Sequence, residues 1–268
     1  MFLSAEVTDF QLFNPSQDIS NSEINSYKAQ KKEVLNDLKN YLLVDGNSLN
    51  GDEIQKHLFP EDDIDIFLSH SHGDADQVIK LAILLEKKGL KVFVDSCVWG
   101  NSFDLLKVID KKYCRNSDDS AYDYDKRNYS TSHVYMMLNT ALHKMIDRCE
   151  LFLFLGTPNS ISVKNGIENQ QSLKSPWLYS ELSFLKHVRQ KTKFHLALES
   201  LNESLGLKRT ILVDGVNVEY QKPELDYKIS TSSLQKWLRE PKQDIFREFQ
   251  SLYTKFEKSN SSNDRNLS

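Results

Sequence analysis

The sequence has few cysteines and no long apolar segment, and these shortages exclude several classes of protein. Its 268 residues contain only three cysteines, Cys97, Cys114 and Cys149. None of them forms a C-x-x-C pair, so neither a disulfide scaffold nor a zinc site is indicated, and reduced thiols are expected. The longest apolar run, at 151–155, is far too short to span a bilayer, and the first residues do not resemble a signal peptide. We therefore expect a soluble, cytoplasmic protein without a membrane partner.

An excess of charge of one sign is also missing. The 34 basic residues face 38 acidic ones, which gives a net charge of -4. Because no basic stripe is present, nucleic acid is not an expected partner. The chain has neither G-x-x-x-x-G-K-[ST] nor G-x-G-x-x-G after a strand, which excludes the P-loop and Rossmann phosphate loops. The seven histidines form no metal-binding pattern, so we expect no metal.

The apolar residues that are present alternate between strand and helix patterns. Short apolar runs at 64–68, 91–95 and 151–155 predict buried strands, and 194–198 and 210–214 are further strand candidates. Helical stripes separate them; one begins near Val78 and ends at Gly89, and another runs from Val134 to Cys149. This order predicts an α/β fold, with an open, mostly parallel sheet and helices on both faces.

The segments around this α/β unit differ from it in pattern. Residues 1–60 are expected to form an N-terminal helical extension, with an irregular arm over 1–22 and helices within 23–44 and 52–59. The α/β domain is expected over 61–220, with a polar, Tyr-rich insert at about 104–133. Residues 221–257 should form two closing helices, at 231–238 and 244–256, and 258–268 a disordered tail.

Ligands of such sheets bind beyond the carboxyl ends of the strands, so the loops there hold the candidate binding residues. The turn 69-SHSHGD-74 could bind a ligand through its backbone N–H groups, or it could simply be a helix cap formed by Ser71 or Asp74. The loop after the second strand contains Trp99, which could cover a planar ring or pack on a helix. Ser69, His70, His72 and Cys97 would allow a Ser or Cys hydrolase, but the G-x-S-x-G elbow of such enzymes is missing.

A carboxylate in an apolar helix face is the most informative feature of the chain. Ser175-Pro176 predicts a helix start, and one side of that helix then carries Trp177, Phe184, Leu185 and Val188. Glu181 falls among them. It could sit at the edge of that face and reach water or an arginine. If it lies partly out of water at the ligand edge of the sheet, it would attract a nearby cation strongly.

Four segments together resemble the Toll/interleukin-1 receptor (TIR) domain, and most closely its bacterial, NAD-consuming members. The resemblance covers roughly residues 62–220. The W-x-x-x-E spacing of Trp177 and Glu181 resembles the catalytic helix of NAD glycohydrolases. The four segments are 65-DIFLSHSH-72, 87-KKGLKVFVDS-96, 99-WGNSF-103 and 175-SPWLYSEL-182.

This resemblance implies a flavodoxin-like, five-stranded parallel sheet and cleavage of the nicotinamide–ribose bond of NAD+, which would be substrate and not cofactor. The product would be ADP-ribose or a cyclic form of it, in anti-phage defence signalling or NAD depletion. Glu181 is the implied catalytic residue. The resemblance also implies a homo-oligomer formed through contacts between TIR domains, and an effector or sensor protein as a partner. The implied substrate-binding residues are Ser69, His70, Ser71, Asp95, Ser96, Trp99 and Trp177.

The chain departs from the family in two ways, and two other functions stay open. The insert at 104–133 is unusual, and Ser71 and His72 stand where several catalytic members carry basic residues. We hypothesise that Arg115, Lys126 and Arg127 of the insert contact the pyrophosphate instead. One alternative function is a non-enzymatic TIR interaction module that binds partners through 96–103. The other is an enzyme like a nucleoside deoxyribosyltransferase, which would share the sheet and a catalytic Glu.

Overall fold

A five-stranded parallel sheet forms the centre of the protein, in the order β3-β2-β4-β1-β8. Helices flank the sheet, and the fold is α/β and flavodoxin-like, as the sequence predicted. The five strands are β1 (Leu3–Thr8), β2 (Ile66–Ser69), β3 (Val92–Val94), β4 (Leu151–Leu155) and β8 (Tyr227–Ser230). The computed structural model describes residues 3–14, 19–29, 51–58, 64–94, 102–118, 120–163, 171–173, 175–186 and 220–264.

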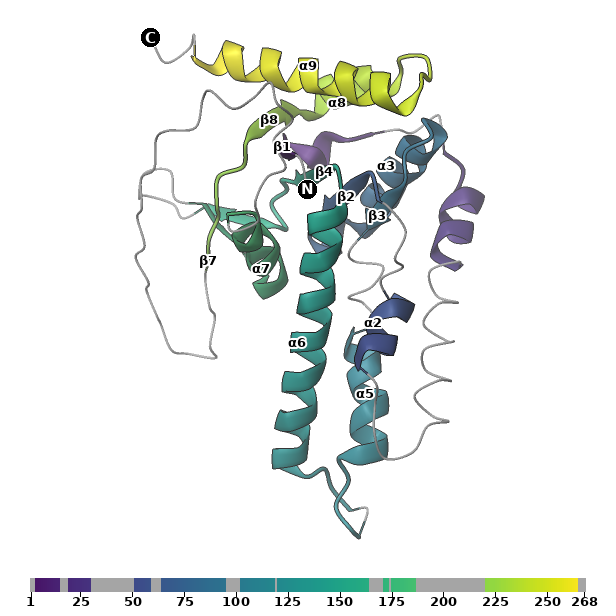
Figure 1. Cartoon of the computed structure of the whole chain (residues 1–268), viewed down its shortest axis with the longest axis vertical. Helices are drawn as coiled ribbons and strands as arrows, with labels where there is room; N and C mark the ends of the chain where they lie inside the picture. Colours follow the sequence, from purple (N-terminus) through teal and green to yellow (C-terminus); the bar gives the residue numbers. More distant parts are fainter. Residues whose placement is uncertain are drawn as a thin grey trace.

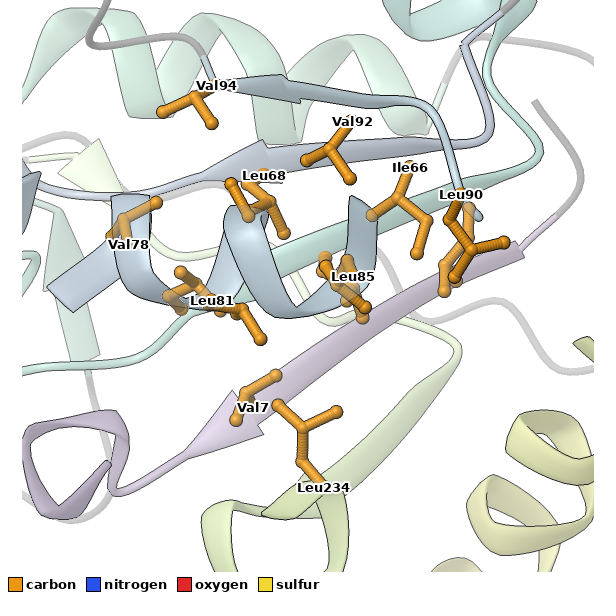
Figure 2. Packing of buried hydrophobic residues seen from close by; sticks show 14 of the residues in the cluster. Val7, Ile66, Leu68, Val78, Leu81, Leu85, Leu90, Val92, Val94 and Leu234 are labelled. Atoms are coloured by element: carbon orange, nitrogen blue, oxygen red, sulfur yellow. The ribbon is translucent and has the colours of Figure 1, made fainter. Parts of the chain in front are cut away.

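One face of the sheet packs against helices α3 (Ala75–Lys87), α8 (Thr231–Leu238) and α9 (Ile245–Asp264). Figure 2 shows Leu81 and Leu85 of α3 beside the strand residues of this apolar cluster. The short 3-10 turn η2 (His72–Asp74) leads into α3. Just after α3, Gly89 takes a φ of +90°, which a residue with a Cβ rarely adopts. The helices α3, α8 and α9 confirm three of the helices that the sequence predicted.

The opposite face is covered by α2 (Gly51–Leu58), α5 (Ser102–Tyr113), α6 (Tyr124–Arg148) and α7 (Pro176–Leu185). Phe67 and Phe152 stack on this face with ring centroids 5.3 Å apart. A small antiparallel sheet of β5 (Ile161–Val163), β6 (Gln171–Leu173) and β7 (Tyr220–Gln221) contacts α7. The core therefore consists of two apolar layers, one on each side of the strands.

The predicted insert at 104–133 is a helical hairpin. It consists of α5 and the first turns of α6, and a bridge between Arg115 and Tyr122 closes the turn between them. Asp123 caps α6 by accepting a hydrogen bond from the backbone N–H of Lys126, which explains why α6 starts earlier than its apolar stripe. Since α6 leads directly into β4, its first turns project past the carboxyl ends of the strands (Figure 1).

The N-terminal region is not simply the helical extension that the sequence predicted. Residues 21–29 and α2 are helical, but β1 lies inside the sheet, parallel to both β4 and β8. The strand was missed because three of its six residues, Ser4, Glu6 and Thr8, are polar. Ser4 and Glu6 are nearly buried with partners: Ser4 Oγ donates to Asp226, and Glu6 pairs with Lys222. The predicted helix over 23–44 lies outside the described residues beyond position 29.

The C-terminal part differs from the prediction in two further respects. Both strand candidates, 194–198 and 210–214, lie outside the described residues, and the sheet ends in β8, which the sequence analysis did not identify. The helix α9 continues to Asp264, so residues 258–264 are helical and not part of a disordered tail. Among the helices that the structure describes, none has the length and apolar character needed to cross a bilayer.

Candidate functional site

Glu181 lies fully buried at the carboxyl end of β2. The α7 helix that carries it starts as predicted, with Pro176 in its first turn and Ser175 Oγ accepting a hydrogen bond from the backbone N–H of Trp177 at 3.2 Å. Glu181 has an exposed fraction of 0%. Its Oε2 accepts a hydrogen bond from Ser69 Oγ at 2.5 Å, and Ser69 is the last residue of β2. The carboxylate is therefore held at the ligand edge of the sheet.

The buried face of α7 is rotated slightly from the predicted one. Leu178, Leu182 and Leu185 surround Glu181 on the buried face, whereas Trp177 is only partly buried. The Trp177 ring lies 5.0 Å from the ring of Tyr135 on α6, with an interplanar angle of 35°. Trp177 thus stands one turn before Glu181, as predicted, but it packs on a neighbouring helix.

The position of Ser69 coincides with the point where the strand order reverses. From β2 the chain passes through α3 to β3 on one side, and then returns to β4 on the other side of β2. Ser69 and Phe154 of β4 are register partners across this boundary. In parallel sheets ligands bind at such switch points, so Glu181 lies where the fold favours a ligand site.

The turn after β2 is held by the loop after β4. His70 is 3% exposed, and its Nδ1 lies 3.3 Å from the carbonyl oxygen of Leu68. The Asp74 carboxylate accepts hydrogen bonds from Thr157 Oγ1 at 2.5 Å and from Asn159 Nδ2 at 2.8 Å. These bonds join the two loops that border the switch point, and the sequence analysis did not anticipate them.

The helix-cap alternative for this turn is only partly correct. Ser71 and Asp74 occupy the N-cap positions of η2 and α3, but neither side chain makes a capping hydrogen bond. The carbonyl oxygen of Ser71 accepts a hydrogen bond from the Asp74 N–H at 2.9 Å. The predicted binding residues Asp95, Ser96 and Trp99 lie outside the described residues. Within the part of the chain that is described, no cluster of three His, Cys, Asp or Glu side chains could hold a metal.

Two hydrogen bonds between α6 and α7 hold Ser180, the residue next to Glu181. Ser180 Oγ donates to Asn139 Oδ1 at 2.6 Å and lies 3.0 Å from His143 Nε2. Because the hydroxyl proton is used toward Asn139, His143 acts as the donor to Ser180, which is therefore not an activated nucleophile. The His143 ring stacks on Phe184 at 4.2 Å, and burial lowers the pKa of His143 below its usual value.

A second buried polar pair lies on the same face of the sheet. Glu6 of β1 is the register partner of Phe154, on the side opposite to Ser69. Lys222 Nζ lies 2.6 Å from Glu6 Oε2, and the two side chains are only 7% and 6% exposed. The ammonium group also lies 5.8 Å from the centroid of the Phe154 ring. Sequence reasoning missed both residues, since the one signal was a single Glu in a short, otherwise uncharged stretch.

Comparison of the chain with protein-family models, with curated proteins and with solved structures finds no match. The site is consequently defined by its own geometry. It combines a buried carboxylate at the end of β2 with a buried ion pair at β1, on the other side of β4.

Proposed function

We propose that the protein is an NAD+ nucleosidase that cleaves the nicotinamide–ribose bond, with Glu181 as the catalytic residue. One observation carries the proposal: the Glu181 carboxylate lies out of solvent at the sheet's switch point, oriented by a hydrogen bond from Ser69. The TIR-like spacing of Trp177 and Glu181 supports the same reaction.

The chemistry of the bond explains why one carboxylate suffices. Nicotinamide in NAD+ is a pyridinium, so the electron pair of the breaking C1′–N bond neutralises it, and it leaves without a general acid. The ribose left behind acquires oxocarbenium character, which a fixed carboxylate close to C1′ stabilises. Burial strengthens that attraction, because the local dielectric constant is lower than in water. Water then adds to C1′ and loses a proton to give ADP-ribose, or a nucleophile within the same molecule adds and gives a cyclic product.

The residues around Glu181 would bind and orient the substrate. Ser69 fixes the carboxylate, and a ribose hydroxyl can take over its hydrogen bond when NAD+ enters. Since Glu181 has no exposed surface, the side chains that cover it must move apart to admit the substrate. His70, Ser71 and the turn that contains them, and Trp177 on α7, are proposed to line the nicotinamide and ribose positions, together with Asp95, Ser96 and Trp99.

The cellular setting is proposed from the TIR resemblance. A cytoplasmic enzyme that destroys NAD+ or converts it into a signal suits anti-phage defence. In such a system activity depends on assembly, and the proposed partners are further copies of this chain and an effector or sensor protein.

A structural role for Glu181, in a non-enzymatic TIR interaction module, is the second candidate. The observation that favours it is the same complete burial, because a carboxylate bonded to Ser69 also fastens α7 onto β2. The two functions differ in what the loss of the negative charge does. Loss of the charge alone removes catalysis, whereas a fastening role needs only a hydrogen-bond acceptor.

Glu181→Gln tests the proposal, because it keeps the size and a hydrogen-bond acceptor but removes the charge. Concentrated protein is incubated with NAD+, and in parallel with a deoxynucleoside, and the released base is quantified. We expect at least about a 100-fold loss of nicotinamide release, with the melting temperature within a few degrees of the wild type. Glu224→Gln, at an exposed glutamate, is the matched control. A folded Glu181→Gln protein with normal turnover would refute the assignment, and release of base only from the deoxynucleoside would indicate the transferase.

A further inference from the structure

Glu6 and Lys222 form a charged group on the far side of Phe154 from Glu181. Ser69, Phe154 and Glu6 are consecutive partners across β2, β4 and β1, so their side chains leave the same face of the sheet. Two strand spacings separate Ser69 from Glu6, which is about 10 Å between their Cα atoms. At the carboxyl ends of the strands, the Glu181 carboxylate therefore lies next to β2 and the Lys222 ammonium group next to β1. The Phe154 ring of β4 lies between them.

The pair also reaches the carboxyl end of β4. A Cβ added at Gly156, the first residue after β4, would lie 3.0 Å from Glu6 Oε1 and 3.3 Å from the carbonyl oxygen of Val7. Glu6 thus directs one carboxylate oxygen toward Gly156, the first residue after β4, and the other toward Lys222. A buried ion pair gives little stability beyond that of apolar residues of the same size, so its presence at this edge suggests another use.

The cations first considered for the pyrophosphate are too far away. Arg127 lies about 24 Å along the α6 axis from His143, at a rise of about 1.5 Å per residue, and His143 contacts the residue beside Glu181. Arg127 instead pairs with Asp110 at 3.0 Å, and Arg115 stacks on Tyr122 at 4.3 Å. Neither arginine, nor Lys126 one position before Arg127 on α6, can contact a phosphate of a substrate whose C1′ lies at Glu181 of the same chain.

We infer that Lys222 binds the phosphate group next to the scissile ribose, and that Glu6 is its counter-ion when no substrate is present. This inference rests on the proposed function and specifies its substrate class, a nucleotide and not a nucleoside. The nearest anionic group to C1′ in NAD+ is the phosphate on the 5′ carbon of the same ribose. Lysine binds phosphate as a point charge on a flexible stem, and burial strengthens the attraction. Glu6 competes with the phosphate for the ammonium group.

Two substrates that share the reacting bond separate this role from a structural one. NAD+ carries the 5′ phosphate, and nicotinamide riboside lacks it. Lys222→Met should raise the KM for NAD+ at least tenfold and leave kcat/KM for the riboside unchanged. Glu6→Gln removes the competitor and should lower the KM for NAD+ several-fold. A pair that only stabilises the fold would change both substrates in the same direction in both variants, and that result would overturn the inference.

A variant in which Glu6 and Lys222 are exchanged controls for loss of folding. Removing one partner of a buried pair destabilises a protein, whereas Glu6→Lys/Lys222→Glu keeps the pair and moves the cation onto β1. We expect this variant to unfold near the wild-type temperature and to lose most of the preference for NAD+ over the riboside. An exchanged protein that kept the wild-type preference would show that Lys222 does not select the phosphate.

Calorimetric measurement of ADP binding tests the phosphate site at Lys222 independently of turnover. If the wild type cleaves neither substrate, the proposed function fails, but the anion site is still tested. At least tenfold weaker ADP binding by Lys222→Met than by the wild type supports the inference. Equal affinities, or no binding to the wild type, contradict it.

Discussion

The side-chain oxygens of Ser69 and Glu181 lie 2.5 Å apart, although 112 positions separate the two residues in the sequence. The short distance is typical of a hydroxyl that donates to a charged carboxylate. It joins the end of β2 to the middle of α7, so the strand and the helix together determine where the carboxylate points.

Ser69→Ala should lower kcat for nicotinamide release about tenfold, because the carboxylate loses the donor that orients it. The free energy of unfolding should also fall, by about 1.5–3 kcal/mol, as for other hydrogen bonds to charged groups. Ser69→Thr keeps the hydroxyl and is the control for both measurements. Unchanged kcat in a destabilised Ser69→Ala protein would assign the bond to folding alone.

The double variant Arg115→Ala/Arg127→Ala should leave the KM for NAD+ unchanged. Both side chains are engaged at the tip of the α5–α6 hairpin, far from Glu181. Steady-state kinetics of the purified variant test this expectation. An increase in KM would show that the hairpin reaches a site, which the distance along α6 permits only in another copy of the chain.

Stability should depend on pH through His143. Burial lowers its pKa in the folded protein below 6.5, so between these two values the unfolded chain binds a proton that the folded chain does not. The free energy of unfolding therefore falls as the pH drops through this window. Melting temperatures from pH 7.5 to 5.5 should decline less in His143→Gln than in the wild type. Parallel pH profiles of the two proteins would contradict this explanation.

Breaking the ion pair of Lys88 and Glu248 should weaken the attachment of α9, because the remaining charge would be buried without its partner. The two side chains are 4% and 0% exposed, with the ammonium nitrogen 3.1 and 3.0 Å from the two carboxylate oxygens. Lys88→Met leaves a charge buried, and we expect a loss of about 3–5 kcal/mol in urea denaturation. The double variant Lys88→Met/Glu248→Leu should recover much of this loss. If the double variant is less stable than the single one, the desolvation argument is wrong.

Removal of residues 1–9 should abolish cooperative unfolding, because β1 is an inner strand with a parallel partner on each side. Circular dichroism during thermal denaturation measures the effect. Leu12→Ser, at a side chain that is 67% exposed, is the control and should behave as the wild type. A truncated protein with a sharp transition would mean that another segment can occupy the place of β1.

The strands that could be predicted from sequence are those with continuous apolar runs. β2, β3 and β4 are buried on both faces and therefore carry apolar residues at nearly every position. In β1 and β8, Glu6 and Lys228 interrupt the pattern. Glu6 is accepted inside the fold only because Lys222 approaches from a distant segment, and no local pattern encodes that approach.

In the candidate site too, residues with a local sequence signal could be predicted and contacts between distant segments could not. Glu181 could be predicted because its helix has a clear start at Ser175 and an apolar face, which are local features. Ser69, which donates the hydrogen bond to Glu181, was a candidate only because it follows a predicted strand. The contacts that depend on packing between loops, such as the bonds of Asp74 to Thr157 and Asn159, had no signal in the sequence.

The inner position of β1 has a consequence for synthesis on the ribosome. Its two neighbours, β4 and β8, begin at Leu151 and Tyr227, so β1 leaves the exit tunnel long before either of them and cannot pair until β4 has been translated. Contacts between such distant segments slow the closure of a sheet and leave strand edges open to aggregation. A chaperone would therefore protect the newly made segment that contains β1 until its partners have been translated.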